Sequence, residues 1–398
     1  MLARGLLRGL KRQVKLFTPG TVNTSVSVKQ ALMYDHSDQL QDFRDMVADT
    51  RKRLLALVKA SYLDYATIFL PGPENYALEA ALGSAFPRVI SPEDPKSMLI
   101  ISNGVSGERM VQICNYLEIP YIVLRFGESE PYTAAEVLEM LRRRPTISHV
   151  AAVHSEITTG LLNPITEIGE LLHDYNPDIT FIVDAINSIG AVDLDVYKAR
   201  AGFVVGSPNK CIQGVPGLAF VLANIEKLRV CRNQARSYTL DLWALWDYQL
   251  KHPGEFSSLP PTHVLAAFHQ ALIELEQEGG VEARQQRYTA NQHYLQQALQ
   301  ALGFTLFLDP TNQGPGVTVV LEPKHRNYHY SRKSHTGLYE YLSKHGVLIY
   351  PGRLKHVPSF RIATIGDLTI ENVKGLVQRI QEAFEEMQIP LPLKSLHK

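Results

Sequence analysis

The sequence predicts an α/β fold, in which a mainly parallel sheet is covered by helices on both faces. Strand-like and helix-like segments alternate over residues 37–223, and the strand-like runs are apolar almost throughout, as strands buried on both faces are. After about residue 280 this alternation changes, and two helix-like segments are followed by strand-like runs, which predicts a smaller α+β domain. We therefore expect an N-terminal arm at 1–30, a large domain at 31–280 and a small C-terminal domain at 281–398.

The individual elements follow from the spacing of apolar residues. Short apolar runs bounded by polar or turn-forming residues predict strands, and apolar residues recurring every three or four positions predict helices. In the large domain the expected strands are 67–70, 98–102, 121–126, 149–154, 179–185, 201–207 and 218–223. The expected helices are 37–60, 76–85, 108–117, 133–144 and 164–175. In the small domain we expect a helix at 282–303, a loop at 307–315, strand-like runs at 316–323, 348–353 and 359–366, and a further helix between the first two of these runs.

Composition excludes several classes of protein. The 398 residues carry 40 basic and 40 acidic side chains, and 45% of the residues are apolar. A neutral balance without a basic stripe argues against nucleic-acid or membrane-surface binding. The three widely spaced cysteines form neither a disulfide framework nor a zinc cluster, so we expect a reducing compartment and no metal site. No apolar run reaches the ~18–20 residues of a membrane span, and no nucleotide-binding fingerprint is present.

The first 17 residues, MLARGLLRGLKRQVKLF, are compositionally unusual. They contain five basic residues and no acidic residue. A mitochondrial presequence has this character, and so does an arm that packs on a partner subunit. We expect a cytoplasmic protein, with mitochondrial targeting as the alternative.

Polar residues gather at the predicted strand ends. Ligands of open parallel sheets bind outside the carboxyl ends of the strands. Glu156 follows one strand, Asp184 ends the next, and Ser207 ends a third. Lys210 lies just beyond, in the segment GSPNKCIQGVPG at 206–217. The sequence thus places an acid, an amine and hydroxyl groups at one edge of the sheet.

Asp184 and Lys210 allow two interpretations. They can form an ion pair, because a partly desolvated strand-end carboxylate needs a neighbouring cation or donor. They can also serve pyridoxal 5'-phosphate (PLP). In PLP enzymes a lysine forms the Schiff base and a carboxylate partners the protonated pyridine nitrogen. The freed lysine then moves the proton between Cα and C4′. Spacing alone leaves both interpretations open.

Several longer stretches resemble one known family. These are VHSEITTGLLNPI (153–165), FIVDAINSIG (181–190), SPNKCIQGVPG (207–217) and SFRIATIG (359–366). In this order they are similar to class V aminotransferases, which have the PLP-dependent transferase fold-type I with a seven-stranded sheet. Within that class they resemble the 2-aminoethylphosphonate–pyruvate transaminases. LFTPGTVNTS (16–25), YTLDLW (238–243), PTHVLAAF (261–268) and GGVEARQQRY (279–288) extend the similarity.

The resemblance implies roles for the residues that match its motifs. Lys210 would be the Schiff-base lysine, Asp184 the partner of the pyridine nitrogen, and Ser207 a phosphate ligand. Thr262 would reach the cofactor phosphate of a neighbouring subunit in a homodimer. The planar fork of Arg361 would bind the acid group of the substrate. The resemblance also implies cofactor contacts from Gly72, Glu74, Asn75, Ser106, Thr158 and Asn209, and substrate contacts from Gly20 and Glu156.

Two stretches depart from the family pattern. A glycine- and serine-rich turn is usual where this chain has Pro71-Gly72-Pro73-Glu74-Asn75-Tyr76, and an aromatic ring is usual at the position of Ser106. Proline removes an N–H donor, and glutamate places an anion near a phosphate. Besides transfer of nitrogen from 2-aminoethylphosphonate to pyruvate, the alternatives are alanine– or serine–glyoxylate transamination, an aminophosphonate lyase, and a diverged non-catalytic subunit.

Overall fold

The computed structural model describes residues 14–330, 337–350, 354 and 357–393. These residues form two compact units. The larger unit contains 24–287 and 308–315, and the smaller contains the remaining described residues. The predicted domain boundaries, after residues 30 and 280, stay a prediction. The basic leader falls largely on residues 1–13, which lie outside the described residues.

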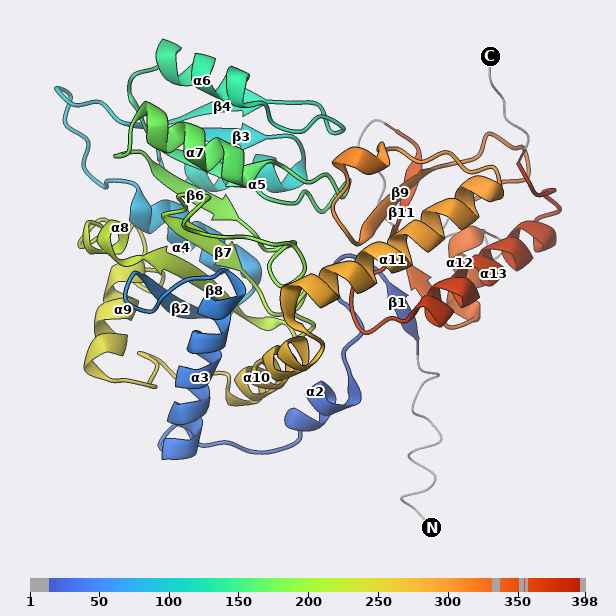
Figure 1. Ribbon diagram of the computed structural model, residues 1–398, viewed down its shortest axis with the longest axis horizontal. Coiled ribbons are helices and arrows are strands. Elements are labelled where there is room, and N and C mark those ends of the chain that lie inside the picture. Colours follow the sequence, from blue (N-terminus) through green and yellow to red (C-terminus); the bar gives the residue numbers. More distant parts are fainter. Residues whose placement is uncertain (1–13, 331–336, 351–353, 355–356, 394–398) are drawn as a thin grey trace. The chain divides into compact units, whose positions relative to one another are not determined.

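The larger unit is built on the seven-stranded sheet that the sequence predicts (Figure 1). Its strands have the order β2-β8-β7-β6-β5-β3-β4, and β8 runs antiparallel to both of its neighbours while the other adjacent pairs are parallel. The strands are β2 (Tyr65–Gly72), β3 (Ser97–Ser102), β4 (Tyr121–Arg125), β5 (Ile147–Val153), β6 (Thr180–Asp184), β7 (Phe203–Gly206) and β8 (Gly217–Asn224). The predicted α/β class with a mainly parallel sheet is therefore confirmed.

Helices cover both faces of this sheet because its strands are apolar on both sides. Side chains alternate between the faces along a strand. In β6, Phe181 and Val183 belong to one buried cluster, and Ile182 belongs to the other. The first cluster includes residues of α3 (Gln41–Leu57), α6 (Ala134–Arg143), α7 (Ile165–Tyr175) and α10 (Thr262–Gln277). The second includes residues of α4 (Glu74–Ala85), α5 (Val105–Tyr116), α8 (Ile225–Arg229) and α9 (Leu242–Lys251).

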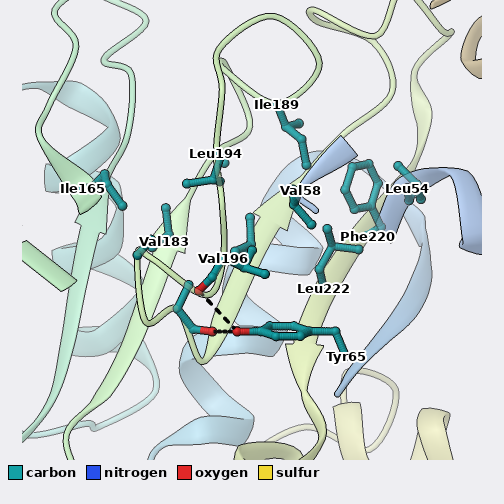
Figure 2. Packing of buried hydrophobic residues seen from close by; sticks show 14 of the residues in the cluster. Leu54, Val58, Tyr65, Ile165, Val183, Ile189, Leu194, Val196, Phe220 and Leu222 are labelled. Atoms are coloured by element: carbon teal, nitrogen blue, oxygen red, sulfur yellow. Dashed lines mark hydrogen bonds between the residues drawn. The ribbon is translucent and has the colours of Figure 1, made fainter. Parts of the chain in front are cut away.

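Figure 2 shows part of the first cluster around Tyr65. Its ring packs among buried aliphatic side chains such as Leu222 and Val196. Its hydroxyl donates to the carbonyl oxygen of Ala201 at 2.7 Å. A buried tyrosine therefore keeps its polar end satisfied inside an apolar layer.

The strand directions set where a site can form. β3, β5, β6 and β7 run the same way, so their carboxyl ends reach the same edge of the sheet. β2 also ends there, because it pairs antiparallel with β8 and Gly72 faces Gly217. We call this edge the rim; it comprises the segments that follow these five strands and the segment that enters β8.

The smaller unit contains two short sheets. β9 (Val317–Leu321) pairs antiparallel with β11 (Ser359–Ala363), and β1 (Lys15–Phe17) pairs parallel with β10 (Val347–Ile349). Its helices are α12 (Leu338–Lys344), α13 (Ile370–Glu386) and the greater part of α11 (Gly280–Ala301). Among the described residues, no helix is both long and apolar enough to cross a membrane.

Some elements were not expected from the sequence. They are β1, α2 (Val26–Ala31), α8, α9, α10 and α13. The expected loop at 307–315 contains a short 3₁₀ helix, η2 (Pro310–Asn312), and most of it groups with the larger unit. The side chain of Asp309 caps this turn by accepting the N–H of Thr311.

Candidate active site

Asp184 is a buried acid at the rim. It ends β6 and lies two residues after Ile182, so it points to the sheet face that α4 and α5 cover. Its side chain accepts the backbone N–H of Ile186 at 3.0 Å. Burial raises the pKa of Asp184 to about 6, although the Ile186 N–H opposes this rise; the charge of Glu156 adds to it. This carboxylate is therefore poorly compensated, and a cation placed beside it would be bound favourably.

Lys210 is a buried amine in the segment that joins β7 to β8. Its Nζ lies 3.8 Å from Oε1 of Glu74, the first residue of α4. Burial lowers the pKa of Lys210, and the nearby carboxylate of Glu74 opposes this shift. The charge of Asp184 also acts to raise this pKa, so the two predicted catalytic residues lie within electrostatic range of each other. The structure thus brings Asp184, Lys210 and Glu74 together at the rim.

Glu156 is a fully buried carboxylate with a dense set of donors. It accepts the N–H and the hydroxyl of Ser106, both at 3.0 Å. It also accepts the hydroxyl of Thr158 at 2.9 Å and its N–H at 3.2 Å. Ser106, at the start of α5, therefore binds a carboxylate at a position where the family resemblance implies an aromatic ring. These four bonds hold Glu156 and Thr158 in one fixed arrangement at the end of β5.

Ser207 and Asn209 follow β7 directly and are both buried. The Ser207 hydroxyl has no hydrogen-bond partner among the described residues. A buried hydroxyl without a partner is costly, so this atom suits a ligand that brings an acceptor. An anionic oxygen would meet this need.

The turn into α4 departs from the family pattern, and the structure shows its geometry. Gly72 has φ of +138°, and a Cβ there would lie 2.4 Å from the ring of Tyr76. Only glycine fits both constraints. Asn75 is exposed, and its side-chain oxygen accepts a hydrogen bond from Arg109 at 3.0 Å.

Arg109 is a cation at the rim that the sequence did not predict. It lies on α5, and its charge lowers the pKa of both Asp184 and Lys210. The only signal in the sequence is its place three residues after Ser106, at the start of a helix that follows a rim strand. Nothing in that pattern distinguishes it from a solvated surface arginine.

Three predicted residues are not brought to the rim by the described contacts. Gly20 and Arg361 belong to the smaller unit. Arg361 is buried on β11, and its guanidinium carbon lies 4.2 Å from the centre of the Tyr350 ring. Thr262 is the half-buried first residue of α10. Their roles in binding substrate and cofactor stay predictions.

Known sequences are similar to this chain over nearly its whole length. A 2-aminoethylphosphonate–pyruvate transaminase of Lactiplantibacillus plantarum is 39% identical over 368 residues, which cover 92% of this chain and 97% of the relative. The transaminase of the same name from Salmonella typhimurium is 40% identical, covering 94% of this chain and 98% of its own. A bifunctional phosphonoacetaldehyde hydrolase/aminoethylphosphonate transaminase of Clostridioides difficile is 38% identical, but only 56% of its length is matched.

Solved structures share the fold at lower identity. The ureidoglycine–glyoxylate aminotransferase of Bacillus subtilis has a TM-score of 0.84 at 22% identity, covering 96% of this chain and 95% of its own. The alanine–glyoxylate aminotransferase of Nostoc sp. has a TM-score of 0.83 at 21% identity, covering 94% and 97%. The family model described as aminotransferase class-V matches residues 28–354. The chain therefore belongs to the class V aminotransferases.

Proposed function

We propose that this protein is a PLP-dependent transaminase that moves the amino group of 2-aminoethylphosphonate to pyruvate, giving phosphonoacetaldehyde and L-alanine. The observation that carries the proposal is the buried Lys210 amine, within electrostatic range of the buried Asp184 carboxylate at the rim of a class V fold. The choice of substrates rests on the relatives that bear this name, which match over more than nine-tenths of the chain.

The residues at the rim fit the cofactor that the family uses. Burial leaves the Asp184 carboxylate poorly compensated, and a protonated ring nitrogen would supply the cation that it needs. The Ser207 hydroxyl, which has no partner among the described residues, can donate to a phosphate oxygen. The rim thus offers an amine for the aldehyde, a carboxylate for the ring nitrogen and a hydroxyl for the phosphate of this cofactor.

When bound, PLP supplies an aldehyde that bonds to amines and a ring that stabilises the electrons left by the broken Cα–H bond. The chain supplies the proton transfers. Burial lowers the pKa of Lys210, so a larger fraction of its amine is unprotonated than in an exposed lysine, and the unprotonated Nζ is the form that can accept a proton. Glu156, fixed by Ser106 and Thr158, holds its carboxyl group in one place within electrostatic range of Asp184.

Substrate binding requires cations, because phosphonate and pyruvate are both anions. Arg361 is the candidate for the pyruvate carboxylate, and alternatively for the phosphonate, since its planar fork can bind two oxygens. A single site would then serve two half-reactions in turn. The amine loads nitrogen in the first, and the 2-oxo acid removes it in the second.

The proposal is tested by incubating the PLP-loaded protein with pyruvate and a panel of amino donors. Alanine should form with 2-aminoethylphosphonate, together with phosphonoacetaldehyde. Lys210→Ala should lose both turnover and the visible absorbance of the loaded protein. If 2-aminoethylphosphonate yields no alanine while another amine does, the substrate assignment is wrong. A wild-type protein that never becomes coloured with PLP would refute the transaminase assignment altogether.

We propose further that the enzyme is a homodimer in which Thr262 serves the neighbouring subunit's cofactor. The half-buried place of Thr262 at the start of a long helix suits a contact across an interface. Lys210→Ala and Thr262→Asp should each be inactive alone. In a mixture of co-folded chains about a quarter of wild-type activity should return, because half of the dimers carry one intact shared site. No recovery in such a mixture would argue for sites built from one subunit.

A further inference from the structure

One buried cation lies outside the rim and contacts the backbone beside Lys210. Arg284, on α11, is only 1% exposed and is the largest fully buried side chain of the described residues. Its Nη1 donates to the carbonyl oxygen of Cys211 at 2.7 Å. Cys211 is the residue directly after Lys210, so a rigid guanidinium bonds to the main chain that carries the amine.

The guanidinium of Arg284 is itself held by an acid. Its Nε donates to Oε2 of Glu278 at 2.6 Å. Arg287 shares this carboxylate, donating from Nε to Oε1 at 2.7 Å. Burial alone would raise the pKa of Glu278, but Arg287 and Arg284 outweigh it and lower this pKa. The carboxylate therefore stays ionised and holds Arg284 in one orientation.

The segment that Arg284 contacts is a tight turn under local strain. The N–H of Gln213 donates to the carbonyl of Lys210 at 3.1 Å, and that of Gly214 to the carbonyl of Pro208 at 2.8 Å. Gln213 has φ of +67°, a conformation that side-chain-bearing residues rarely adopt. Such a turn persists only where the surroundings fix it. Arg284 fixes it from the side of α11.

We propose that Arg284 is a positioning residue for the Lys210 amine, acting through the Cys211 carbonyl and anchored by Glu278. The proposal rests on the proposed function, because it takes Lys210 as the amine that bonds to PLP. The GGVEARQQRY segment fits this role, because Gly279 and Gly280, with φ of +109° and +79°, form the turn between Glu278 and the part of α11 that presents Arg284. Arg284 does not touch the reacting atoms. It keeps the turn in the conformation from which Nζ reaches the rim.

The test uses the full-length chain with Arg284→Lys and Arg284→Gln, and with Arg287→Gln as the matched control. Lysine keeps the buried charge but cannot bridge Glu278 and Cys211 with a planar fork. We expect both Arg284 variants to take up PLP about ten- to a hundredfold more slowly, since small displacements of a reacting group have effects of this size. The pH midpoint of the visible absorbance should also shift in both. Arg287→Gln should have a much smaller effect on both, because it weakens the anchor at Glu278 but leaves in place the bond from Arg284 to the Cys211 carbonyl.

A second measurement needs neither turnover nor cofactor. Hydrogen exchange of the peptide 207–216 in the cofactor-free chain reports the Gln213 and Gly214 amides directly. Slow exchange in the wild type, faster by at least about tenfold in Arg284→Lys, supports the proposal. Fast exchange in the wild type, or equal exchange and equal PLP uptake in Arg284→Lys, overturns it. A wild type that takes up no PLP but protects this turn from exchange would refute the proposed function, while the role of Arg284 in fixing the turn would still be supported.

Discussion

Replacing Glu74 by glutamine should tighten the binding of PLP. Oε1 of Glu74 lies 3.8 Å from Nζ of Lys210. When this nitrogen bonds to the aldehyde of the cofactor, the localised ammonium charge is removed and the attraction is weakened. At this distance the attraction is about 1 kcal/mol in water and about 4 kcal/mol at an effective dielectric constant of about 20. The side chain of Glu74 is 26% exposed, so the lower part of this range applies. We therefore expect Glu74→Gln to bind PLP about tenfold more tightly, since about 1.4 kcal/mol corresponds to a tenfold gain in affinity.

The repulsion between Glu74 and a phosphate acts in the same direction, because Glu74 opens the helix whose N-terminal N–H groups favour anions. The assay is a titration of the cofactor-free protein with PLP, followed by visible absorbance. Glu79→Gln, on the same helix, is the control for a change of net charge and should leave the dissociation constant unchanged. If Glu74→Gln binds PLP more weakly than the wild type, Glu74 is a ligand of the cofactor and this reasoning is wrong.

Three further predictions concern stability. The pKa of Asp184 is raised from 3.8 to about 6, so the folded state binds its proton more tightly than the unfolded state. Relative to Asp184→Asn, the cofactor-free wild type should therefore lose about 2 kcal/mol of unfolding free energy as the pH rises from about 4 to about 7. Parallel pH curves for the two proteins, measured by denaturant titration, would contradict the buried carboxylate. Gly104→Ala should lower the free energy of unfolding by about 1–3 kcal/mol, because its Cβ would lie 2.5 Å from the fixed carboxyl of Glu156. Gly375→Ala, whose Cβ would have nothing within 4 Å, should instead stabilise α13 by up to about 1 kcal/mol. Ser106→Ala should lower the free energy of unfolding, measured by chemical denaturation, by about 1.5–3 kcal/mol, since it removes a donor from the buried carboxylate of Glu156. An unchanged free energy of unfolding would mean that water replaces the hydroxyl.

The strands of the large sheet could be predicted because strands buried on both faces consist almost entirely of apolar residues. Each run from β2 to β8 is short, apolar and bounded by polar residues, and the predicted ranges differ from the observed strands by only a few residues. The same logic placed Asp184 and Lys210 at one edge, and the structure brings them within electrostatic range. Local sequence was sufficient for these features because each depends on a single strand and the residues after it.

Features that depend on long-range pairing could not be read from the sequence. Glu74 reaches Lys210 because β2 pairs with β8, a strand that lies far along the chain. The bond from Ser106 to Glu156 and the bond from Arg284 to the Cys211 carbonyl likewise join separate elements. In each case the residue types are ordinary, and only the topology gives them a partner.

The reversed direction of β8 has a consequence for the amine that forms the proposed covalent bond. Because β7 and β8 are adjacent and antiparallel, the chain leaves the sheet and re-enters it at the same edge, and the ten residues between Gly206 and Gly217 form a hairpin connection. A parallel crossover would have carried this chain away toward a helix. Here both ends of the connection are fixed by neighbouring paired strands, so the pairing of β7 with β8 limits how far Lys210 can move from this edge.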